Sequence, residues 1–385
     1  MRIVHVSDFY LPQLGGIETH IADLVARQRL AGHQVDVVTA CSELAEDSPS
    51  GRVIASTDQG GRLTHLRPSM IAAAAGAVDS GRYEVVHVHA GLVTPLAFSV
   101  AARASTAGTP TILTVHSLVS YLYPAFRLAN VVTRWTRWPI AWTAVSDLAA
   151  RPLGRLLGGD TPVPVLPNAV DRDWWRIDPV RRDGSDVLLV AVMRLAPRKR
   201  PLHLLRMLRQ VRRTVPSSVR LNALIIGEGP ERHSLERYLD RHDMTDWVSL
   251  PGRFSHEQIR EVYRRADVFM APANLESFGI AAMEARVAGL PVVAMARGGI
   301  REFIRDGHEG LLVDGDRDMV AALATLASDP AARYRIASHN LAIAPNWGWP
   351  DVLALTDREY ERAAAIQRLG LAPKARPRPA TRIAI

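Results

Sequence analysis

E-S-F-G-I-A-A-M-E, residues 276–284, places two carboxylates, Glu276 and Glu284, on either side of a Ser-Phe-Gly turn. The preceding run A-D-V-F-M-A-P, residues 266–272, is apolar and ends in proline, as is typical of a short buried strand. The pattern predicts a strand, a loop that carries Glu276, and a helix that begins near Gly279 with Glu284 in its second turn.

A helix N-terminus between two carboxylates suits a ligand that carries both phosphate and hydroxyl groups. Unpaired N–H groups and the helix dipole favour phosphate, and carboxylates accept hydrogen bonds from hydroxyls. Four or five helical residues rise roughly 7 Å, a span that suits a sugar at one carboxylate, a diphosphate between them and a ribose at the other. The alternative is an ordinary surface helix with a solvated Glu284 and a loop acid at Glu276.

Length and composition indicate a globular protein of two domains. The chain has 385 residues, 48% of them hydrophobic, and a mean hydropathy near zero. The single cysteine, Cys41, excludes a disulfide framework and is typical of a reducing compartment. The N-terminus lacks a signal-peptide pattern and no apolar window reaches the ~18 residues of a membrane span. We therefore expect a cytoplasmic protein.

The net charge of +8 comes largely from an arginine run at 198–213 and a basic end at 370–385. A nucleic-acid-binding protein usually shows a concentrated basic stripe within a recognisable module, so no nucleic-acid partner is expected. Lys199 and Lys374 are the only lysines among 47 basic residues. Because lysine is a compact, mobile charge where arginine is a rigid fork, Lys199 is predicted to have a specific role.

The chain opens with a strand at 2–9, a glycine turn at Gly15 and Gly16, a helix to about 31 and a strand at 35–40. The turn lacks the G-x-G-x-x-G dinucleotide fingerprint. Its glycines serve either a tight turn or the close approach of a substrate phosphate, and both interpretations remain open.

Strands continue to alternate with helical stretches, and the pattern restarts after residue 171, which predicts two doubly wound parallel α/β domains. We place the domains at 1–170 and 171–345, a final helix at 346–369 and a disordered basic tail at 370–385. The further strands are predicted at 85–89, 111–116, 142–146, 163–168, 186–192, 221–226, 247–250, 267–271, 291–294 and 311–313.

Ligands of such sheets bind at the carboxyl ends of the strands, and His116 lies at one of these ends. His87 and His89 occupy alternate positions of one strand, which is compatible with a metal pair or with a structural role. With no third ligand nearby in the sequence, the structural role is favoured.

Taken in order, these motifs resemble the retaining glycosyltransferases of family 4, the group that contains glycogen-synthase-like and mannosyltransferase-like enzymes. The resemblance extends from residue 1 to about 365. It implies the GT-B fold: two Rossmann-like domains facing a central cleft, with a C-terminal helix crossing back to the N-terminal domain. The matching motifs are G-G-I-E at 15–18, His116, P-N-A-V-D at 167–171, Arg194 with Lys199, G-E-G-P at 227–230, the 276–284 stretch, G-L-P-V-V-A at 289–294 and G-G-I-R-E at 298–302.

The resemblance also implies roles for individual residues. Arg194 and Lys199 would clamp the donor diphosphate, Glu276 would orient the hydroxyls of the donor sugar, and His116 would contact the sugar near the reacting carbon. Gly16 would approach the same phosphate from the opposite domain when the two domains close. The residues implied in donor binding are Gly15, Gly16, Gly227, Ser277, Phe278, Gly279, Ile280 and, at the ribose, Glu284.

A retaining enzyme with a nucleophile needs two carboxyls roughly 5 Å apart across the anomeric carbon, and nothing in the sequence indicates such a pair. The resemblance implies front-face attack, in which the departing phosphate oxygen accepts the proton of the acceptor. Arg194 and Lys199 would take the place of a metal ion, so neither a metal nor another cofactor is expected. Asp314 and Asp316 resemble a D-x-D metal motif but precede a helix start, where acidic caps are ordinary.

The expected partners are a UDP- or GDP-sugar and a glycan or lipid-linked acceptor of the cell envelope. Residues 121–142 interleave tyrosine, tryptophan and arginine, a composition typical of a membrane interface. We hypothesise a peripheral contact there with the inner face of the cytoplasmic membrane or with a lipid-linked acceptor. Alternatively, these rings pack against the sheet and cap the acceptor cleft.

Other functions with the same two-domain frame are a sugar-nucleotide epimerase, a phosphorylase and a non-catalytic regulator that binds nucleotide sugars. A phosphorylase needs a lysine for pyridoxal phosphate, and Lys199 is already assigned to the phosphate turn. A regulator would bind nucleotide sugar without turnover.

Overall fold

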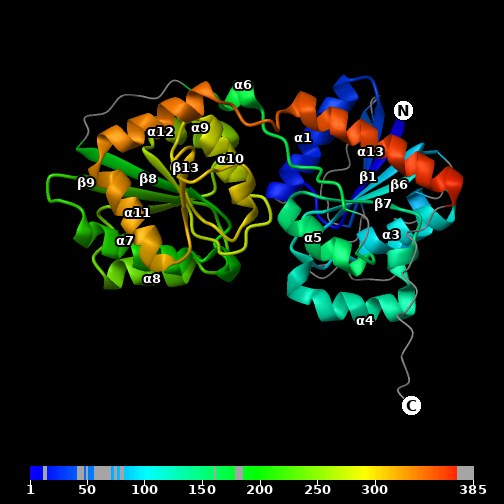
Figure 1. Ribbon diagram of the computed structural model, residues 1–385, viewed down its shortest axis with the longest axis horizontal. Coiled ribbons are helices and arrows are strands. Elements are labelled where there is room, and N and C mark those ends of the chain that lie inside the picture. Colours follow the sequence, from blue (N-terminus) through cyan, green and yellow to red (C-terminus); the bar gives the residue numbers. More distant parts are fainter. Residues whose placement is uncertain are drawn as a thin grey trace, which may run out of the picture. The chain divides into compact units, whose positions relative to one another are not determined.

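The computed structural model describes residues 1–11, 15–40, 47–48, 51–55, 71–72, 76–78, 82–159, 162–177 and 185–370. The chain divides into two compact units (Figure 1). Unit 1 comprises Met1–Pro167 with Val352–Ile385, and unit 2 comprises Asn168–Asp351. The predicted disordered tail, from residue 371 on, lies outside the described residues.

Unit 1 is built on a seven-stranded sheet of order β3-β4-β2-β1-β5-β6-β7. Neighbouring strands are parallel except for the antiparallel pair β3 and β4. The strand order reverses between β1 and β5, and such a switch point is where doubly wound sheets bind ligands. The strands are β1 (Arg2–Ser7), β2 (Gln34–Thr39), β3 (Asp47–Ser48), β4 (Gly51–Ala55), β5 (Val85–Ala90), β6 (Thr111–Val115) and β7 (Ala141–Ala144).

The two faces of this sheet differ in polarity. One face is apolar and packs on α3 (Pro95–Thr106) and α5 (Asp147–Leu156). The other face carries histidines and threonines and lies beneath α1 (Gly16–Leu30) and α13 (Trp349–Leu369), as the hydrogen bonds of Gln28 and Tyr360 show. Figure 1 shows α1 and α13 on the opposite side of the sheet from α3 and α5.

Helix α13 is held on unit 1 through its C-terminal half. Arg362 donates to the Trp142 carbonyl at 2.8 Å, and Gln367 donates to the Ser105 carbonyl at 3.1 Å. The predicted return of the C-terminal helix to the N-terminal domain is therefore confirmed.

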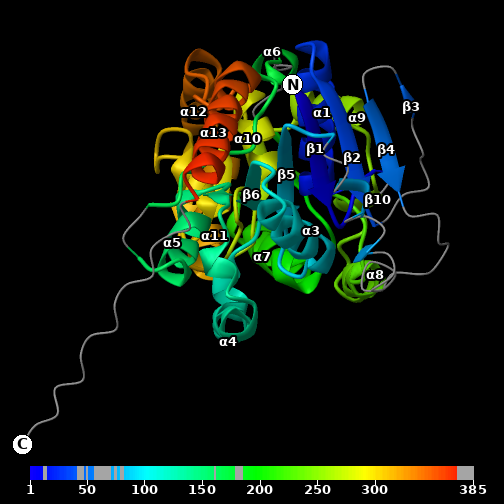
Figure 2. The ribbon, with the colours of Figure 1, turned by 90° about the vertical axis from the view of Figure 1, so that its right-hand side faces the viewer.

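The aromatic segment forms the short 3₁₀ turns Val119–Leu122 and Trp135–Arg137 and helix α4 (Tyr123–Thr133). Trp135 and Trp142 are both 3% exposed and belong to the apolar core of unit 1. For these two rings the packing alternative is right, because Trp135 also donates to the Phe126 carbonyl at 3.2 Å. Helix α4 itself has no buried residue and lies on the outside of unit 1 (Figure 2).

The strand predicted at 163–168 is wrong: this segment makes only an isolated bridge between Val165 and Ala144. Two prolines, Pro164 and Pro167, lack the N–H that a longer ladder would need.

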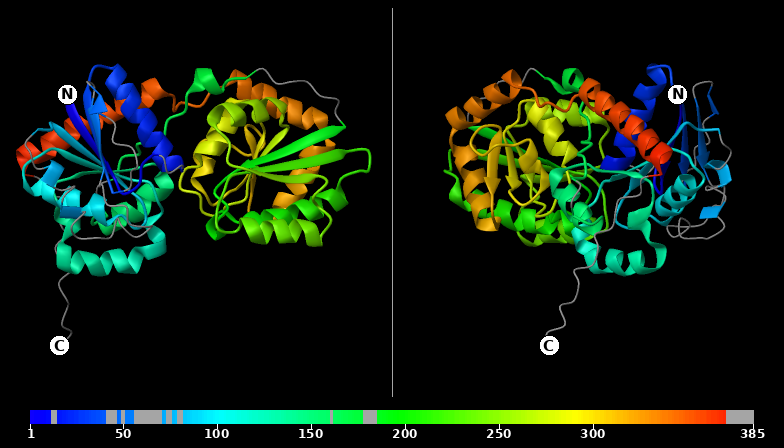
Figure 3. Two further views of the ribbon diagram at one scale, coloured as in Figure 1. Left: turned by 180° about the vertical axis from the view of Figure 1, so that it is seen from behind. Right: turned by 45° about the vertical axis from the view of Figure 1, so that its right-hand side comes forward.

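Unit 2 is built on a six-stranded parallel sheet of order β10-β9-β8-β11-β12-β13, which reverses between β8 and β11 (Figure 3). Its strands are β8 (Asp186–Val192), β9 (Arg220–Ile226), β10 (Val248–Gly252), β11 (Val268–Ala271), β12 (Val292–Met295) and β13 (Gly310–Val313). Its helices are α6 (Arg172–Trp175), α7 (Pro201–Thr214), α8 (Arg232–Arg241), α9 (His256–Arg265), α10 (Ile280–Val287), α11 (Asp316–Ser328) and α12 (Pro330–Ala342).

The core of unit 2 combines alternate sheet residues with apolar residues of α7, α8, α11 and α12. Leu204 and Leu208 of α7 are fully buried. Both units therefore have the doubly wound, Rossmann-like architecture that the alternating pattern predicts, and the α/β fold class is confirmed.

Gly227 directly follows β9 and lies against the loop after β8. Its φ is +138°, and an added Cβ would lie 1.9 Å from the Met193 carbonyl oxygen. A side chain at this position would displace the segment that leads into Arg194. Gly307 also has a positive φ, +78°, but its added Cβ would meet nothing within 4 Å.

We predict that Gly227→Ala destabilises unit 2 much more than Gly307→Ala. The control substitution should cost only the left-handed backbone penalty, about 1–2 kcal/mol, whereas Gly227→Ala adds a clash with backbone. Urea denaturation of both variants measures the difference. Equal costs would contradict the close approach of the two loops.

Candidate active site

The loops that follow β8 and β11 meet at the switch point of unit 2. The first loop carries Arg194, which is exposed, and then the 3₁₀ turn Pro197–Lys199. The second loop carries Glu276. Lys199 Nζ forms an ion pair with Glu276 Oε2, and the two side chains are 23% and 19% exposed. Two of the predicted catalytic residues, 77 positions apart, are thus in direct contact.

Arg200 holds the same two loops together, and sequence reasoning did not identify it. Its guanidinium binds Asp316 through both carboxylate oxygens, at 2.7 and 2.8 Å. It also donates to the Pro272 carbonyl at 3.1 Å and to the Asn274 side chain at 2.8 Å. Asp316, the second acid of the D-x-D sequence, is therefore a structural partner of Arg200 and the first residue of α11.

Helix α10 begins directly after the second loop. Gly279 is its N-cap with φ +96°, and an added Cβ would lie 2.6 Å from the Ile300 side chain. Gly299 donates its N–H to the Glu276 carbonyl at 2.7 Å. An added Cβ on Gly299 would lie 2.2 Å from the Ser277 carbonyl oxygen. These close approaches fix the backbone of residues 276–280 at a helix N-terminus, where N–H groups remain available for an anion.

Two predicted donor-binding residues turn their side chains inward. Phe278 is 3% exposed and packs against Phe303 and Trp347, with ring centroids 5.7 and 5.4 Å away. Glu284 is buried on α10. Tyr263 lies near it, and the pKa of Tyr263 is raised by the burial of Tyr263 itself and by the Glu284 carboxylate. The roles of the Ser277, Phe278 and Ile280 main chain toward phosphate and of Glu284 toward ribose remain predictions.

In unit 1, Gly15 and Gly16 lie at the start of α1, directly after the loop that follows β1. Gly15 is the N-cap, in extended conformation, and its carbonyl accepts from the Thr19 hydroxyl at 3.0 Å. An added Cβ on Gly15 would lie 2.3 Å from the Glu18 carboxylate. Gly15 therefore allows the close approach of the Glu18 carboxylate in the first turn of α1, and a contact of Gly15 or Gly16 with phosphate remains a prediction.

His116 follows β6 and is 5% exposed. Its backbone N–H donates to the Ala90 carbonyl at 2.8 Å, and its Nε2 lies 3.0 Å from His89 Nδ1. Burial lowers the pKa of His116 to about 3, so the ring is neutral.

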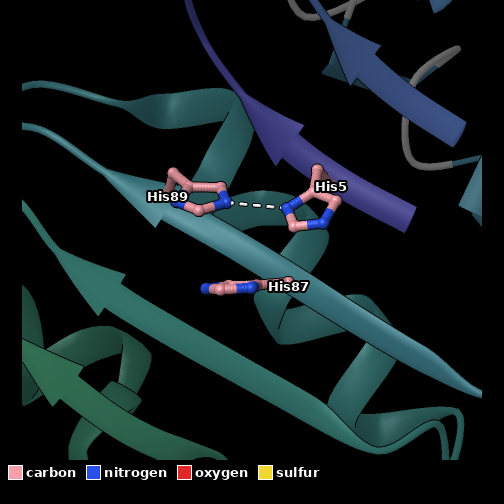
Figure 4. Close-up of side chains that lie close together, drawn as sticks. All are labelled: His5, His87 and His89. Atoms are coloured by element: carbon pink, nitrogen blue, oxygen red, sulfur yellow. Dashed lines mark hydrogen bonds between the residues drawn. The ribbon is translucent and has the colours of Figure 1, made fainter. Parts of the chain in front are cut away.

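His89 in turn belongs to a buried cluster with His5 and His87 on strands β1 and β5 (Figure 4). Their ligand atoms lie within 4.8 Å of one another. The sequence paired His87 with His89 but did not place His5 beside them, because that contact depends on the register of β1 against β5.

Comparisons with known proteins identify the family. A model described as Glycosyltransferase Family 4 matches residues 14–174, and one described as Glycosyl transferases group 1 matches residues 176–340. The chain therefore belongs to the GT-B glycosyltransferases of the family-4 type.

Curated relatives cover most of the chain. The phosphatidylinositol N-acetylglucosaminyltransferase gpi3 subunit of Schizosaccharomyces pombe is 24% identical over 95% of this chain and 82% of its own length. The GDP-mannose-dependent alpha-(1-6)-phosphatidylinositol monomannoside mannosyltransferase of Mycobacterium tuberculosis is 27% identical over 94% of this chain and 98% of its own length.

Among solved structures, Anabaena Alr3699/HepE in complex with UDP and glucose matches with a TM-score of 0.73 at 20% identity. The match covers 95% of this chain and 100% of that one, and it supports the fold. Family and fold together make this chain a glycosyltransferase that uses a nucleotide sugar.

The buried histidines of unit 1 make its stability sensitive to acid. Burial lowers the pKa of His5 to about 4 and that of His20 to about 3, and it holds those of His87 and His89 well below 6.5. The unfolded chain therefore binds protons below pH 6.5 that the folded unit does not bind, so stability falls as the pH is lowered. Asp8 opposes this, because burial raises its pKa to about 6.

We predict that the free energy of unfolding of unit 1 decreases by ~1.4 kcal/mol per pH unit for each such histidine between about pH 6 and pH 4. His87→Gln should reduce this slope by the contribution of one histidine, ~1.4 kcal/mol per pH unit. His233→Gln, at a side chain that is 77% exposed, should not change it. Thermal denaturation from pH 8 to pH 4 measures the slope, and a flat profile would show that the histidines are not buried neutral.

Proposed function

We propose that this protein is a retaining, metal-independent hexosyltransferase that moves a hexosyl unit from a UDP- or GDP-sugar to a lipid-linked acceptor at the cytoplasmic face of an anionic membrane. The observation that carries the proposal is the Lys199–Glu276 ion pair at the switch point of unit 2, beside the N-terminus of α10. It places a cation, a carboxylate and free backbone N–H groups together where an open α/β sheet binds its ligand.

The chemistry follows from these groups. As the bond between the sugar and the phosphate breaks, negative charge develops on the diphosphate, and Arg194 and Lys199 stabilise it. Glu276 accepts hydrogen bonds from sugar hydroxyls, and its ion pair with Lys199 holds the carboxylate in place. The departing phosphate oxygen accepts the proton of the acceptor hydroxyl. The acceptor oxygen forms its bond to the anomeric carbon on the face from which the phosphate leaves.

A mechanism without an enzyme nucleophile is supported by the state of the two acids. Glu276 is engaged by Lys199, and Glu284 is buried within α10. Neither is a free carboxylate of the kind that double displacement requires.

Arg194 supplies the second cation, since its exposed guanidinium has no hydrogen-bond or ion-pair partner among the described residues.

A lipid-linked acceptor is supported by the surface of α4. Leu128, Val131 and Val132 are 72%, 74% and 84% exposed and form one stripe at i, i+3 and i+4 spacing. Arg127 and Arg134 flank the stripe and are exposed. An apolar stripe beside arginines suits an anionic bilayer surface. Both relatives described above are named for a phosphatidylinositol-containing acceptor. Among the described residues, no helix is long and apolar enough to cross a membrane.

We predict that Lys199→Ala and Glu276→Ala each reduce transfer by about 10²–10³-fold, the loss expected for one group that stabilises the transition state. Both variants should melt near the wild type, because a partly exposed ion pair contributes at most about 1 kcal/mol. Arg198→Ala, on the same turn but exposed, is the matched control and should retain activity.

The assay first needs the donor. A thermal-shift panel of UDP-, GDP- and ADP-sugars identifies it, since a ligand at 100 times its Kd adds about 2.7 kcal/mol. Transfer is then measured with that donor and a lipid extract. Full activity of either site variant would refute the site assignment, and nucleotide-sugar binding without turnover would favour a regulator.

For the membrane contact, we predict that wild-type protein co-sediments with phosphatidylserine vesicles and much less with phosphatidylcholine vesicles. Leu128→Glu combined with Val132→Glu should abolish binding, because both changes place charge within the apolar stripe. Leu30→Glu changes a residue that is 87% exposed on α1 of the same unit and should have no effect. Absence of binding by the wild type would remove the membrane from the proposal.

A further inference from the structure

A continuous chain of buried hydrogen bonds runs beneath α1 and α13 of unit 1 and ends at His116. Its members come from four strands and both helices. In order, its contacts are Leu113 O to Thr143 Oγ1 (3.4 Å), Thr143 to Thr114 (2.8 Å), Thr114 to His87 Nε2 (2.9 Å), His87 Nδ1 to Tyr360 (3.1 Å), Tyr360 to Gln28 Nε2 (2.9 Å), Gln28 Oε1 to His5 Nε2 (2.7 Å), His5 Nδ1 to His89 Nε2 (2.9 Å) and His89 Nδ1 to His116 Nε2 (3.0 Å).

We call this chain of hydrogen bonds the histidine relay. In its first part, from Leu113 to His87, the donors and acceptors can be assigned in only one consistent direction. The Leu113 carbonyl can only accept, so the Thr143 hydroxyl donates its single proton to it. Thr143 must then accept from Thr114, and Thr114 must accept from His87 Nε2. Because burial keeps His87 neutral, its Nδ1 carries a lone pair, which accepts from the Tyr360 hydroxyl.

The same direction continues to the far end. Tyr360 accepts from the Gln28 amide, so the Gln28 oxygen faces His5 and accepts from its Nε2. Neutral His5 then accepts at Nδ1 from His89, and neutral His89 accepts at Nδ1 from His116 Nε2. The proton of His116 is therefore on Nε2, and its Nδ1 carries a lone pair.

That lone pair lies on a buried atom. His116 Nδ1 is a buried atom with no hydrogen-bond partner among the described residues. A buried acceptor without a partner is costly, so a site that leaves one open is suited to a ligand that donates a hydrogen bond to it.

A metal ion at His5, His87 and His89 is the competing interpretation, and the geometry opposes it. All six ring nitrogens of the three residues already have hydrogen-bond partners. The rings of His87 and His89 are stacked, with centroids 4.2 Å apart and planes 24° from parallel. Lone pairs lie in the ring plane, so those of stacked rings do not converge on one point, and Figure 4 shows the His87 ring below the His89 ring.

We propose that the histidine relay fixes the tautomer of His116 so that its Nδ1 accepts a hydrogen bond from a hydroxyl of the transferred sugar, with Gln28 and Tyr360 as positioning residues. This inference rests on the proposed function. A lone pair at Nδ1 accepts a hydrogen bond from a hydroxyl and repels a carboxylate, so the relay favours a hydroxyl at this position of the sugar.

The direct test is ¹⁵N NMR of the full-length protein labelled at histidine, with the His116 signals assigned by their loss in His116→Gln. We expect unprotonated Nδ1 and protonated Nε2 at His116 without any ligand. A proton on Nδ1 would overturn the relay. A shift of the His5, His87 and His89 signals on addition of zinc would overturn it in favour of a metal site.

The second test separates positioning from general damage. Gln28→Leu removes the acceptor that orients His5, so the His116 tautomers should mix and the affinity for the nucleotide sugar should fall at least tenfold. The affinity for the nucleoside diphosphate alone should not change. The matched control is Gln367→Leu, which removes one hydrogen bond of α13 away from the relay and should leave both affinities intact.

Tyr360→Phe serves as a milder variant that removes only a hydroxyl, and it should weaken sugar-dependent affinity in the same direction. Unchanged tautomers and unchanged affinities in both variants would overturn the positioning role. If the wild type binds no nucleotide sugar, the proposed function fails, while the NMR result still decides the direction of the relay.

Discussion

The ion pair between Lys199 and Glu276 is the constraint on which the site of unit 2 depends. It joins the loops after β8 and β11, the two strands between which the order of the sheet reverses. A lysine side chain is long and mobile, so its charge is positioned only if its partner is fixed. Glu276 is fixed because its carbonyl accepts from Gly299, and Arg200 ties both loops to Asp316. Close backbone contacts, which glycines permit, thus hold a cation where phosphate charge develops.

In unit 1 the site residues are held by a layer of buried polar side chains and not by close backbone contacts. Histidines in such a position are costly unless each nitrogen has a partner, because burial disfavours both the charged ring and an open hydrogen bond. The relay satisfies this condition for His5, His87 and His89 and leaves His116 Nδ1 without a partner in the part of the chain that the structure describes. A fully directed network gives each ring one tautomer, which solvent-exposed histidines would not have.

The two-domain fold and two residues of the unit 2 site, Lys199 and Glu276, could be predicted from the sequence. Alternation of apolar strands with helices sets the doubly wound architecture, and the proline after 266–271 and the glycine at 279 mark where a strand stops and a helix starts. Lys199 stood out because it is one of two lysines, and Glu276 because it precedes a helix N-terminus. The first signal comes from the composition of the whole chain, and the second needs only neighbouring residues, since helix starts are determined by nearby sequence.

What the sequence by itself determined was the succession of strands and helices along the chain and the chemistry available at their ends. Only the tertiary structure decided which of these groups meet. Gln28 contacts Tyr360 across 332 positions, and Arg200 contacts Asp316 across 116. The burial of Trp135 was also decided only by the tertiary structure, because the sequence around it is compatible with a membrane contact as well as with a protein core. Such contacts depend on strand order and register, which bring distant positions onto one face and leave no periodic signal in the chain.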